Sequence, residues 1–487
     1  MRILKNQRST LLLAIGVFVS SLVIVVFSRS DQFTRLDDPV PAFPGAMGFG
    51  SMTAGGRFGR IVFVTNLFDT TDINDPNYLG SLRWAVEHVW EDAPDILSDE
   101  GRIIVFRVGG TINLSDRLII KNPYTTIAGQ SAPGGIMLRG DELTIATHDV
   151  IIRGLRIRVG DEGSPTCCRD GISIGTYYAD SDVYNVIVDH SSVSWAIDEN
   201  FSIWSESSDD FTVYDISLQW NIISEGLHDS IHVDEEASVT DEHSMGLIIG
   251  NRGSNISIHH NLFAHNWGRN PRIDGIDQVE IINNLIYGWE NAAVEITDNP
   301  VKAHLIGNFF KATDRSSLVE LEIYSLESDE RGILLMDNVV DNPLVNSSLF
   351  YARLPKNESS SGYEFEVFPP SGINFSTAQE AYNSVLANSG ALVPFRDTVD
   401  QRVVNDVIRR SGGVINSQDE VGSWPDIVGL DYPQDTDNDG IPDDWEIEHG
   451  IDPQDPTDAN NYYMRSPGGY TWIEEYVNSL IPLPVDE

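Results

Sequence analysis

Cysteine is almost absent from this sequence. Only Cys167 and Cys168 occur among 487 residues, and the two are adjacent. An adjacent pair cannot cross-link distant parts of a chain, and two thiols are too few ligands for a cysteine-based metal site. The pair is either two ordinary thiols or one vicinal disulfide. A disulfide-stabilised scaffold is therefore excluded, and a chain that is 41% hydrophobic must be held together by its core.

Basic residues are also scarce. Lysine and arginine together number 31, against 74 aspartates and glutamates, which gives a formal net charge of -43. A surface this acidic repels nucleic acid and anionic lipid, so no nucleic-acid partner is expected. Its carboxylates can bind cations. If the substrate is itself a polyanion, a locally basic patch or a bridging cation is needed.

Long hydrophobic runs are absent after residue 30. The one such run, Leu11 to Phe27, follows Arg2, Lys5 and Arg8 near the N-terminus. A basic segment followed by an apolar one is typical of an export signal, and ~17 apolar residues are near the lower limit for spanning a bilayer. Residues 1–30 are therefore predicted to be a signal peptide or a membrane anchor. The remainder is expected to be secreted, periplasmic or on the cell surface.

A short phrase recurs through the middle of the chain. Alternating apolar residues surround one polar residue at a fixed place, as in "ISIHHNLF" (256–263) and "VEIINNLI" (279–286). The fixed polar positions, with consecutive spacings of 30, 40, 23, 24 and 30 residues, are Ser191, Asn221, Asn261, Asn284, Asn308 and Asn338. Such a period with insertions is typical of a solenoid. The predicted fold is all-β, a right-handed parallel β-helix in which stacked Asn side chains hydrogen-bond their copies in neighbouring coils.

The two histidines in "ISIHHNLF" are neighbours on a predicted strand. Successive strand residues point to opposite faces of a sheet. We therefore expect His259 and His260 to face opposite ways, and not to bind one metal together.

From about Ala42 to Asp274 the chain resembles the pectate lyases of the parallel β-helix class. Six phrases occur in the family's order: "AFPGAMGFG" (42–50), "GSLRWAV" (80–86), "TIAGQSAPGG" (126–135), "DGISI" (170–174), "VIVDHSSVSWAIDE" (186–199) and "RNPR" (269–272). The resemblance implies β-elimination of homogalacturonan, in which a base takes the C5 proton of a uronate and the C4 glycosidic oxygen leaves. It also implies calcium, which would bridge an acidic protein and a polyanion.

The resemblance assigns roles to particular residues. The cleft calcium ligands would be Asp170 and Asp198, with Glu199 a further candidate, and the base would be Arg269. Because arginine is normally protonated, the alternative role for Arg269 is electrostatic stabilisation of the developing enolate. Arg272 is expected either to bind a substrate carboxylate with two hydrogen bonds or to form a surface ion pair.

This chain departs from the family pattern at three positions. Ser202 stands where a further calcium-binding Asp is often found, Met245 where a substrate-binding Lys is usual, and Asp274 where a second Arg is usual. A thioether cannot bind a carboxylate. Methylated pectin, another uronan or a shorter chain is therefore the alternative to plain polygalacturonate as the preferred substrate.

Residues 31–352, which contain the repeats, are predicted to form the catalytic β-helix, and the chain after them divides into two further parts. Residues 353–430 are predicted to be irregular covering segments and linker, with one helix near Thr377–Ala387. Residues 431–487 are predicted to form a calcium-loop and helical tail. There "TWIEEYVNSL" opens with a capping box, Thr471 to Glu474, and continues with apolar residues at helical spacing.

The tail carries the complete spacing of an EF-hand loop in "DTDNDGIPDDWE" (435–446). Gly440 is at the sharp turn, and Ile441 would contribute its backbone carbonyl. The predicted tail calcium ligands are Asp435, Asp437, Asp439, Ile441, Asp443 and Glu446. The loop resembles the free-standing calcium loops of exported bacterial proteins, so its expected role is stability or docking rather than catalysis.

These observations predict a secreted, monomeric, calcium-dependent polysaccharide lyase that acts on polygalacturonate or pectin of plant or algal origin. One alternative is a non-catalytic β-helix that binds acidic polysaccharide. A glycoside hydrolase on the same solenoid would need paired carboxylates that flank one bond, and no convincing pair is present. Contact with a membrane is expected only through the N-terminal segment.

Overall fold

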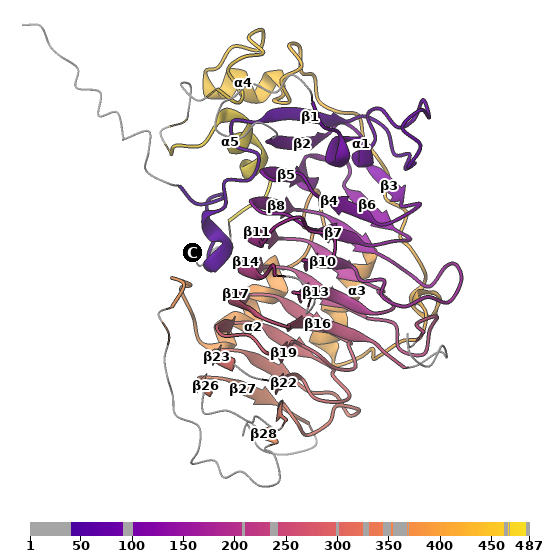
Figure 1. Cartoon of the computed structure of the whole chain (residues 1–487), viewed down its shortest axis with the longest axis vertical. Coiled ribbons are helices and arrows are strands. Elements are labelled where there is room, and N and C mark those ends of the chain that lie inside the picture. The colour runs from indigo at the N-terminus through magenta and orange to yellow at the C-terminus, as the bar shows by residue number, and fades with distance from the viewer. Residues whose placement is uncertain are drawn as a thin grey trace, which may run out of the picture. The chain divides into compact units, whose positions relative to one another are not determined.

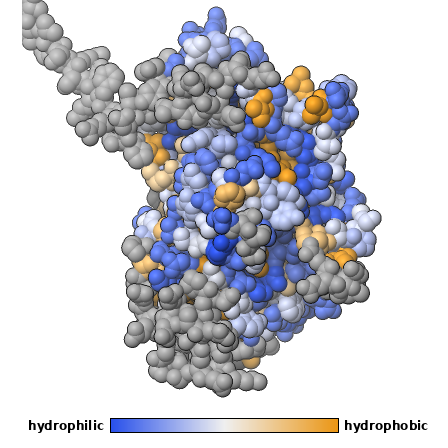
Figure 2. All heavy atoms as spheres, in the orientation of Figure 1, coloured by the Kyte–Doolittle hydropathy of each residue, from blue (hydrophilic) through white to orange (hydrophobic). Residues whose placement is uncertain are grey.

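The computed structural model describes residues 40–90, 101–206, 210–233, 242–298, 301–324, 331–343, 352–353, 368, 370–461, 466 and 468–483. All of them belong to one compact unit, Pro39–Glu487. The predicted signal peptide or anchor lies outside the described residues. Within the described ranges, no helix has the length and apolar character needed to span a bilayer. Hydrophilic residues dominate the face of the molecule seen in Figure 2.

The described strands form three parallel sheets that run side by side along a solenoid (Figure 1). The long sheet contains β1 (Arg60–Val64), β2 (Arg102–Phe106), β5 (Thr125–Ala128), β8 (Val150–Arg153), β11 (Val183–Asp189), β14 (Val213–Gln219), β17 (Gly253–His259), β20 (Val279–Ile282), β23 (Val301–Ile306) and β26 (Arg331–Met336). The helix-covered sheet contains β3 (Gly110–Asn113), β6 (Ile136–Arg139), β9 (Arg156–Arg158), β12 (Ser192–Ser194), β15 (Ile222–Ser224), β18 (Leu262–Ala264), β21 (Leu285–Tyr287), β24 (Phe309–Lys311) and β27 (Val339–Asp341). The cleft sheet contains β4 (Leu118–Ile120), β7 (Leu143–Ile145), β10 (Ile172–Gly175), β13 (Glu199–Trp204), β16 (Met245–Gly250), β19 (Arg272–Asp274), β22 (Val294–Asp298), β25 (Leu321–Ile323) and β28 (Ala352–Arg353). The all-β parallel β-helix predicted from the repeats is confirmed.

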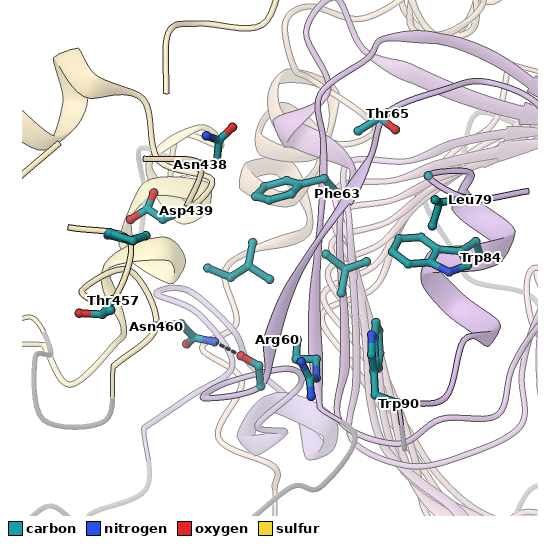
Figure 3. Close-up of a pocket in the computed structure, with 15 residues that line it drawn as sticks. Arg60, Phe63, Thr65, Leu79, Trp84, Trp90, Asn438, Asp439, Thr457 and Asn460 are labelled. Atoms are coloured by element: carbon teal, nitrogen blue, oxygen red, sulfur yellow. Dashed lines mark hydrogen bonds between the residues drawn. The ribbon is translucent and has the colours of Figure 1, made fainter. Parts of the chain in front are cut away.

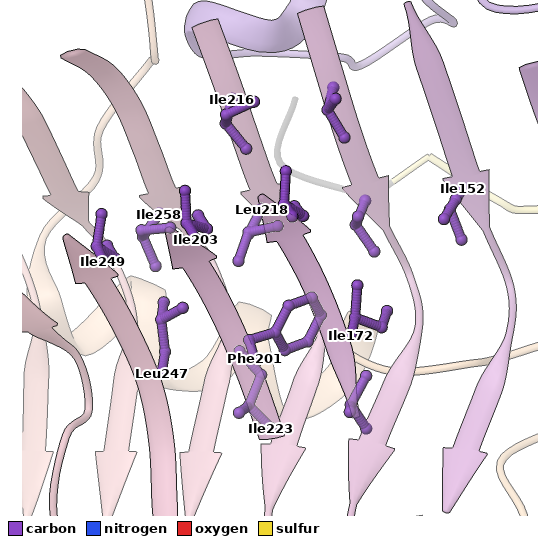
Figure 4. Close-up of a cluster of buried hydrophobic side chains, with 14 of the residues drawn as sticks. Ile152, Ile172, Phe201, Ile203, Ile216, Leu218, Ile223, Leu247, Ile249 and Ile258 are labelled. Carbon is purple, nitrogen blue, oxygen red and sulfur yellow. The ribbon is translucent and has the colours of Figure 1, made fainter. Parts of the chain in front are cut away.

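From β2 onward, each coil contributes one strand to each sheet, so equivalent residues stack at the same register. Apolar side chains that alternate along the strands fill the interior, as Figure 4 shows for Ile172, Phe201 and Leu247. Phe201 of β13 is in register with Ile172 of β10 and Leu247 of β16. Short strands rich in Val and Ile suit this arrangement, because their branched side chains pack well on a pleated surface.

A sharp turn joins the long sheet to the helix-covered sheet in successive coils. One residue in the left-handed region, such as Trp220 (φ 54°) or His260 (φ 55°), redirects the chain. The following Asn then joins its copies: the backbone N–H of Asn221 donates to Oδ1 of Asn261 at 2.9 Å, and the N–H of Asn261 donates to Oδ1 of Asn284 at 2.9 Å. The predicted Asn ladder is confirmed.

The expectation that His259 and His260 face opposite ways is wrong. Their Nδ1 atoms lie 3.0 Å apart, and both side chains are buried. The positive φ of His260 takes it out of the strand's alternation and turns its ring back toward His259. Burial lowers the pKa of both histidines, for His259 to about 4.

Residues beyond the solenoid include two helices where the sequence predicted one. The predicted helix is α2 (Ala378–Asn388), which begins with a capping box at Thr377. A second helix, α3 (Thr398–Arg409), was not predicted. Both pack on the helix-covered sheet, and α3 contributes Val403 and Val407 to that contact (Figure 1). Asp397, which caps α3, is ion-paired with the fully buried Arg158 of β9 at 2.9 Å, so this segment is docked on the β-helix.

The remaining helices are short. The first, α1 (Leu82–Glu87), lies beside β1, and the C-terminal α4 (Asp443–His449) and α5 (Trp472–Ser479) lie at the same end of the solenoid (Figure 1). The predicted capping box of α5, Thr471 with Glu474, is confirmed. Apolar residues of α5, such as Ile473, pack with Ile103 and Val105 of β2. The tail therefore covers the first strands of the long sheet.

Candidate active site

The turns that lead into the cleft sheet bring distant residues together. Asp170 precedes β10, Asp198 precedes β13, Glu199 is the first residue of β13, and Arg269 lies in the turn before β19. Because β10, β13, β16 and β19 are consecutive neighbours in the sheet, residues at corresponding ends of these strands lie close in space. The parallel fold thus converts separations of many residues along the chain into one local constellation.

A cavity of about 720 Å³ lies over this part of the sheet. Its lining includes Asp170, Asp198, Glu199 and Arg269, and the outward side chains of β7, β10, β13 and β16, which are in register. These outward residues are Thr144, Ser173, Ser202 and Ile248. Small or uncharged side chains therefore form the floor, and the charged groups gather at the strand ends.

The three predicted cleft carboxylates come together as a group. Oxygen atoms of Asp170, Asp198 and Glu199 lie within 4.8 Å of one another. Asp170 is held by the backbone N–H of Glu199 at 3.0 Å and by the Ser202 hydroxyl. Burial raises the pKa of Asp170 well above its usual range, and the charges of Asp198 and Glu142 add to this effect.

His243 fixes the second carboxylate. Its Nε2 lies 2.8 Å from Oδ1 of Asp198, and His232 stacks on the His243 ring with centroids 4.3 Å apart. Burial opposes ionisation of Asp198, but the hydrogen bond and charge of His243 outweigh it, so the pKa of Asp198 is lowered. Asp170 and Asp198 therefore have pKa values shifted in opposite directions.

Arg269 stands beside the carboxylates. Its guanidinium contacts Glu199, and its backbone N–H donates to Glu295 at 3.4 Å. Burial lowers the pKa of Arg269, and the neighbouring charge of Arg272 lowers it further. An arginine that acts as a base requires a lowered pKa, so this shift favours that role over electrostatic stabilisation by the protonated form.

Arg272 is placed differently. Its Nη2 donates to Asp274 at 3.1 Å, and it is absent from the residues that line the described cavity. On β19 it is in register with Ile248 of β16 and Glu295 of β22. Of the two expectations for Arg272, the ion pair is the one that the structure contains. Binding of a substrate carboxylate would require exchange of the Asp274 contact.

The sequence did not identify Glu142 and Arg117 as part of the site. Glu142 precedes β7. Its carboxylate accepts hydrogen bonds from the backbone N–H of Asp170 at 3.2 Å and from Nη2 of Arg117 at 2.9 Å. The sequence did contain a sign of Glu142. In "DELTI" (141–145) an acidic residue comes shortly before the first apolar residue of a strand, the same arrangement as at Asp170 and Glu199. These two residues also line the cavity.

The three carboxylates fit a hard divalent cation. Asp170 is buried and repelled by Asp198 and Glu142, so its ionised form needs a positive partner. Oxygen ligands are the set that calcium prefers. Asp170, Asp198 and Glu199 are the residues that would hold it. A second overlapping set, Asp198 with His232 and His243, includes nitrogen ligands, which calcium does not favour.

The predicted tail ligands separate into two groups. Asp435, Asp437 and Asp439 lie together, and Asp439 also lies with Glu446 and with Asp458, which the sequence did not suggest. Asp443 belongs to neither of these two carboxylate groups. Its carboxylate accepts hydrogen bonds from Thr436 and Gln434. The backbone N–H of Ile441 donates to Asp439 at 2.9 Å, and the Ile441 side chain is buried in the tail core.

Comparison with known proteins extends over nearly the whole chain. No protein-family model matches it. A probable pectate lyase C of Emericella nidulans is 33% identical over 453 residues, which cover 91% of this chain and 93% of that protein. A probable pectate lyase C of Aspergillus terreus is 32% identical over 464 residues, with 91% and 94% covered.

Solved structures of similar architecture include the major cedar pollen allergen jun a 1 and a pectate lyase bound to a hexasaccharide. The allergen has a TM-score of 0.48 and 18% identity, and the match covers 71% of this chain and 92% of that one. The lyase has a TM-score of 0.48 and 13% identity, with 73% and 99% covered. On its sequence similarity to the Emericella and Aspergillus proteins, the chain belongs to the pectate lyase family, and the protein is a polysaccharide lyase.

Proposed function

We propose that this lyase cleaves polygalacturonate or pectin by calcium-assisted β-elimination, with Asp170, Asp198 and Glu199 as calcium ligands and Arg269 as the base. The observation that carries the proposal is the convergence of three carboxylates and a half-buried arginine in one cavity. The charge of the cleft is consistent with it. The two arginines that line the cavity, Arg117 and Arg269, already contact Glu142 and Glu199, so a polyanion needs an added cation to approach.

In the proposed reaction Arg269 removes the proton from C5 of a uronate residue. The electron pair of the C5–H bond becomes the C4–C5 double bond, the C4–O bond breaks, and the glycosidic oxygen leaves and takes up a proton. Calcium bound to the uronate carboxylate would make the C5 proton more acidic and stabilise the enolate. Arg269 can accept the proton only when it is neutral, which its burial favours.

The contact between Arg269 and Glu199 has a further consequence. A carboxylate partner favours the protonated form of arginine. If Glu199 is a calcium ligand, its charge is shared with the ion, and the pKa of Arg269 falls further. Calcium binding would thereby prepare Arg269 to act as a base.

Met245 favours a variant of this function. Met245 begins β16, is buried, and is in register with Glu199 of β13. An apolar side chain beside the proposed calcium ligands cannot hold a substrate carboxylate, whereas it tolerates a methyl ester. A preference for partly methylated pectin, or for another uronan, is therefore the second candidate.

The test is ultraviolet absorbance, because elimination produces an unsaturated uronate that absorbs and neither binding nor hydrolysis does. Polygalacturonate, methylated pectin and other uronans are compared with calcium and with a chelator. We expect a calcium-dependent rise with polygalacturonate or pectin. No rise with any uronan under either condition would contradict the proposed function.

We also propose that the protein acts outside the cytoplasm. The basic and apolar N-terminal segment supports this location. Sequencing the N-terminus of the protein recovered from the medium and from the membrane fraction tests it. Recovery from the cytoplasm alone would contradict it.

A further inference from the structure

The C-terminal segment contains a buried carboxylate with no hydrogen-bond partner among the described residues. Glu446 of α4 is fully buried, and neither of its carboxylate oxygens has a partner in that part of the chain. Asp439 and Asp458 are 4% and 1% exposed, and each also keeps one oxygen without a described partner. Oxygen atoms of these three residues lie within 4.8 Å of one another. Buried carboxylates normally have hydrogen bonds or a counter-charge, so this arrangement requires an explanation.

These residues come from different segments and converge on one point. Asp439 lies in the acidic loop, Glu446 in the helix that follows, and Asp458 in a second turn. Asp435 and Asp437 extend the cluster through Asp439. We call these five residues, Asp435, Asp437, Asp439, Glu446 and Asp458, the tail acid cluster.

The neighbouring arginine neutralises only one edge of the cluster. Arg107 donates to Asp435 at 2.6 Å and to the side chain of Asn438 at 2.9 Å. Burial and mutual repulsion raise the pKa of Glu446 to about 8 and that of Asp439 to about 7. Several carboxylate oxygens that face one another suit calcium, which takes six to eight oxygen ligands.

We propose that the tail acid cluster holds one calcium ion, with Asp458 in the place that the EF-hand spacing gives to Asp443, and that this ion fastens the C-terminal segment to the first coil of the β-helix. Asp443 cannot replace Asp458 without loss, because its two oxygens hold Thr436 and Gln434 in place. The site therefore differs from the set that the EF-hand spacing predicts.

The packing around the cluster gives the ion its structural role. Gly440 has a φ of 100°, and a side chain there would approach Ile61 and Phe63 of β1 to 3.2 Å, so the loop lies close against that strand. Ile441 packs with Ile103 of β2. Figure 3 shows Asn438 and Asp439 of the tail opposite Phe63.

A second contact lies beyond Asp458. The side chain of Asn460 accepts from the backbone N–H of Phe58 at 3.1 Å. It also donates to the carbonyl of Gly59 at 2.6 Å, the hydrogen bond drawn as a dashed line in Figure 3. The two ligand-bearing segments therefore contact the start of β1 from two positions. An ion bound to both Asp439 and Asp458 would hold the two segments together against β1. Without the ion, the carboxylates at this place would repel one another.

The experiment is limited proteolysis of the full chain with a protease that needs no calcium. Fragments that end after residue 430 are identified by mass spectrometry. We expect calcium to slow this cleavage about tenfold or more relative to a chelator, because an opened segment is cut in proportion to its population. Equal rates with calcium and with chelator in the wild-type protein would overturn the proposal, and this result needs no variant to fold.

Isosteric variants then identify the ligands. Asp458→Asn and Glu446→Gln are expected to be cut in calcium as fast as the wild type in chelator, whereas the matched control Asp443→Asn stays protected. The reverse result, with Asp458→Asn protected and Asp443→Asn cut, would overturn the proposed ligand set. Asp170→Asn, which alters the cleft, is expected to keep the calcium protection. The tail is thereby tested separately from the proposed catalytic function.

Discussion

Replacement of Asn261 by alanine tests whether the Asn ladder stabilises the β-helix. Asn261 is fully buried, and its Oδ1 accepts from the backbone N–H of Asn221 at 2.9 Å. Its Nδ2 donates to the carbonyl of Leu218 at 2.8 Å and to Oδ1 of Asn284 at 3.1 Å. Alanine at this position leaves the buried backbone N–H of Asn221 and the buried backbone carbonyl of Leu218 without these hydrogen bonds. At about 1–3 kcal/mol for each unsatisfied group, Asn261→Ala is expected to cost about 2–6 kcal/mol of unfolding free energy.

The matched control is Asn338→Ala at the end of the described ladder. Asn338 is half-buried, and its Oδ1 accepts from the backbone N–H of Asn308 at 3.0 Å. Because water can approach this position, the same change is expected to cost no more than about 1 kcal/mol. Denaturant unfolding followed by circular dichroism measures both variants. Equal and small losses for the two would refute the assignment of stability to the ladder.

Three further predictions concern the cleft. Arg269→Lys is expected to reduce turnover in the absorbance assay by about 10²–10⁴-fold, while its circular dichroism spectrum stays unchanged. Activity within a few-fold of the wild type would show that the base is another residue. Asp170→Asn should abolish turnover yet raise the melting temperature in chelator at neutral pH. Because burial raises the pKa of Asp170, its ionised form destabilises the folded state above the ordinary aspartate pKa, and a lower melting temperature would contradict this reasoning. The calcium concentration for half-maximal turnover should rise as pH falls, because Asp170 takes up a proton on acidification and then binds calcium less well. A concentration that stays unchanged across the acidic range would argue against Asp170 as a ligand.

Much of the fold could be predicted because the repeat has one register. The residues from Ser191 to Asn338 mark the same turn in each coil, so their order in the sequence is their order in the ladder. The helix α3 could not be predicted in the same way. Its helical apolar spacing is embedded in a polar segment, and it is held by Arg158, whose burial is visible only in three dimensions.

The proposed cleft residues could be located from local phrases, because Asp170 and Asp198 stand just before apolar strands and Glu199 is the first residue of one. Glu142 was missed because its phrase carried no family signal. Asp458 was missed because the EF-hand spacing assigns its ligands within one loop, whereas Asp458 approaches from another turn. Contacts between separate turns are set by packing, which spacing along the chain does not encode.

The sharp turn between the long and the helix-covered sheets leaves length variation to the other connections. The chain needs only residues 195–198 to pass from β12 to β13, but uses 225–244 to pass from β15 to β16. Asp198, which lines the cavity, lies in the first of these connections, and His243, which contacts Asp198, lies in the second. Insertions there can reshape the opening of the proposed substrate cavity while the strand register beneath stays fixed. Evolution can thus change which polysaccharide the enzyme accepts without redesigning the solenoid that supports the chemistry.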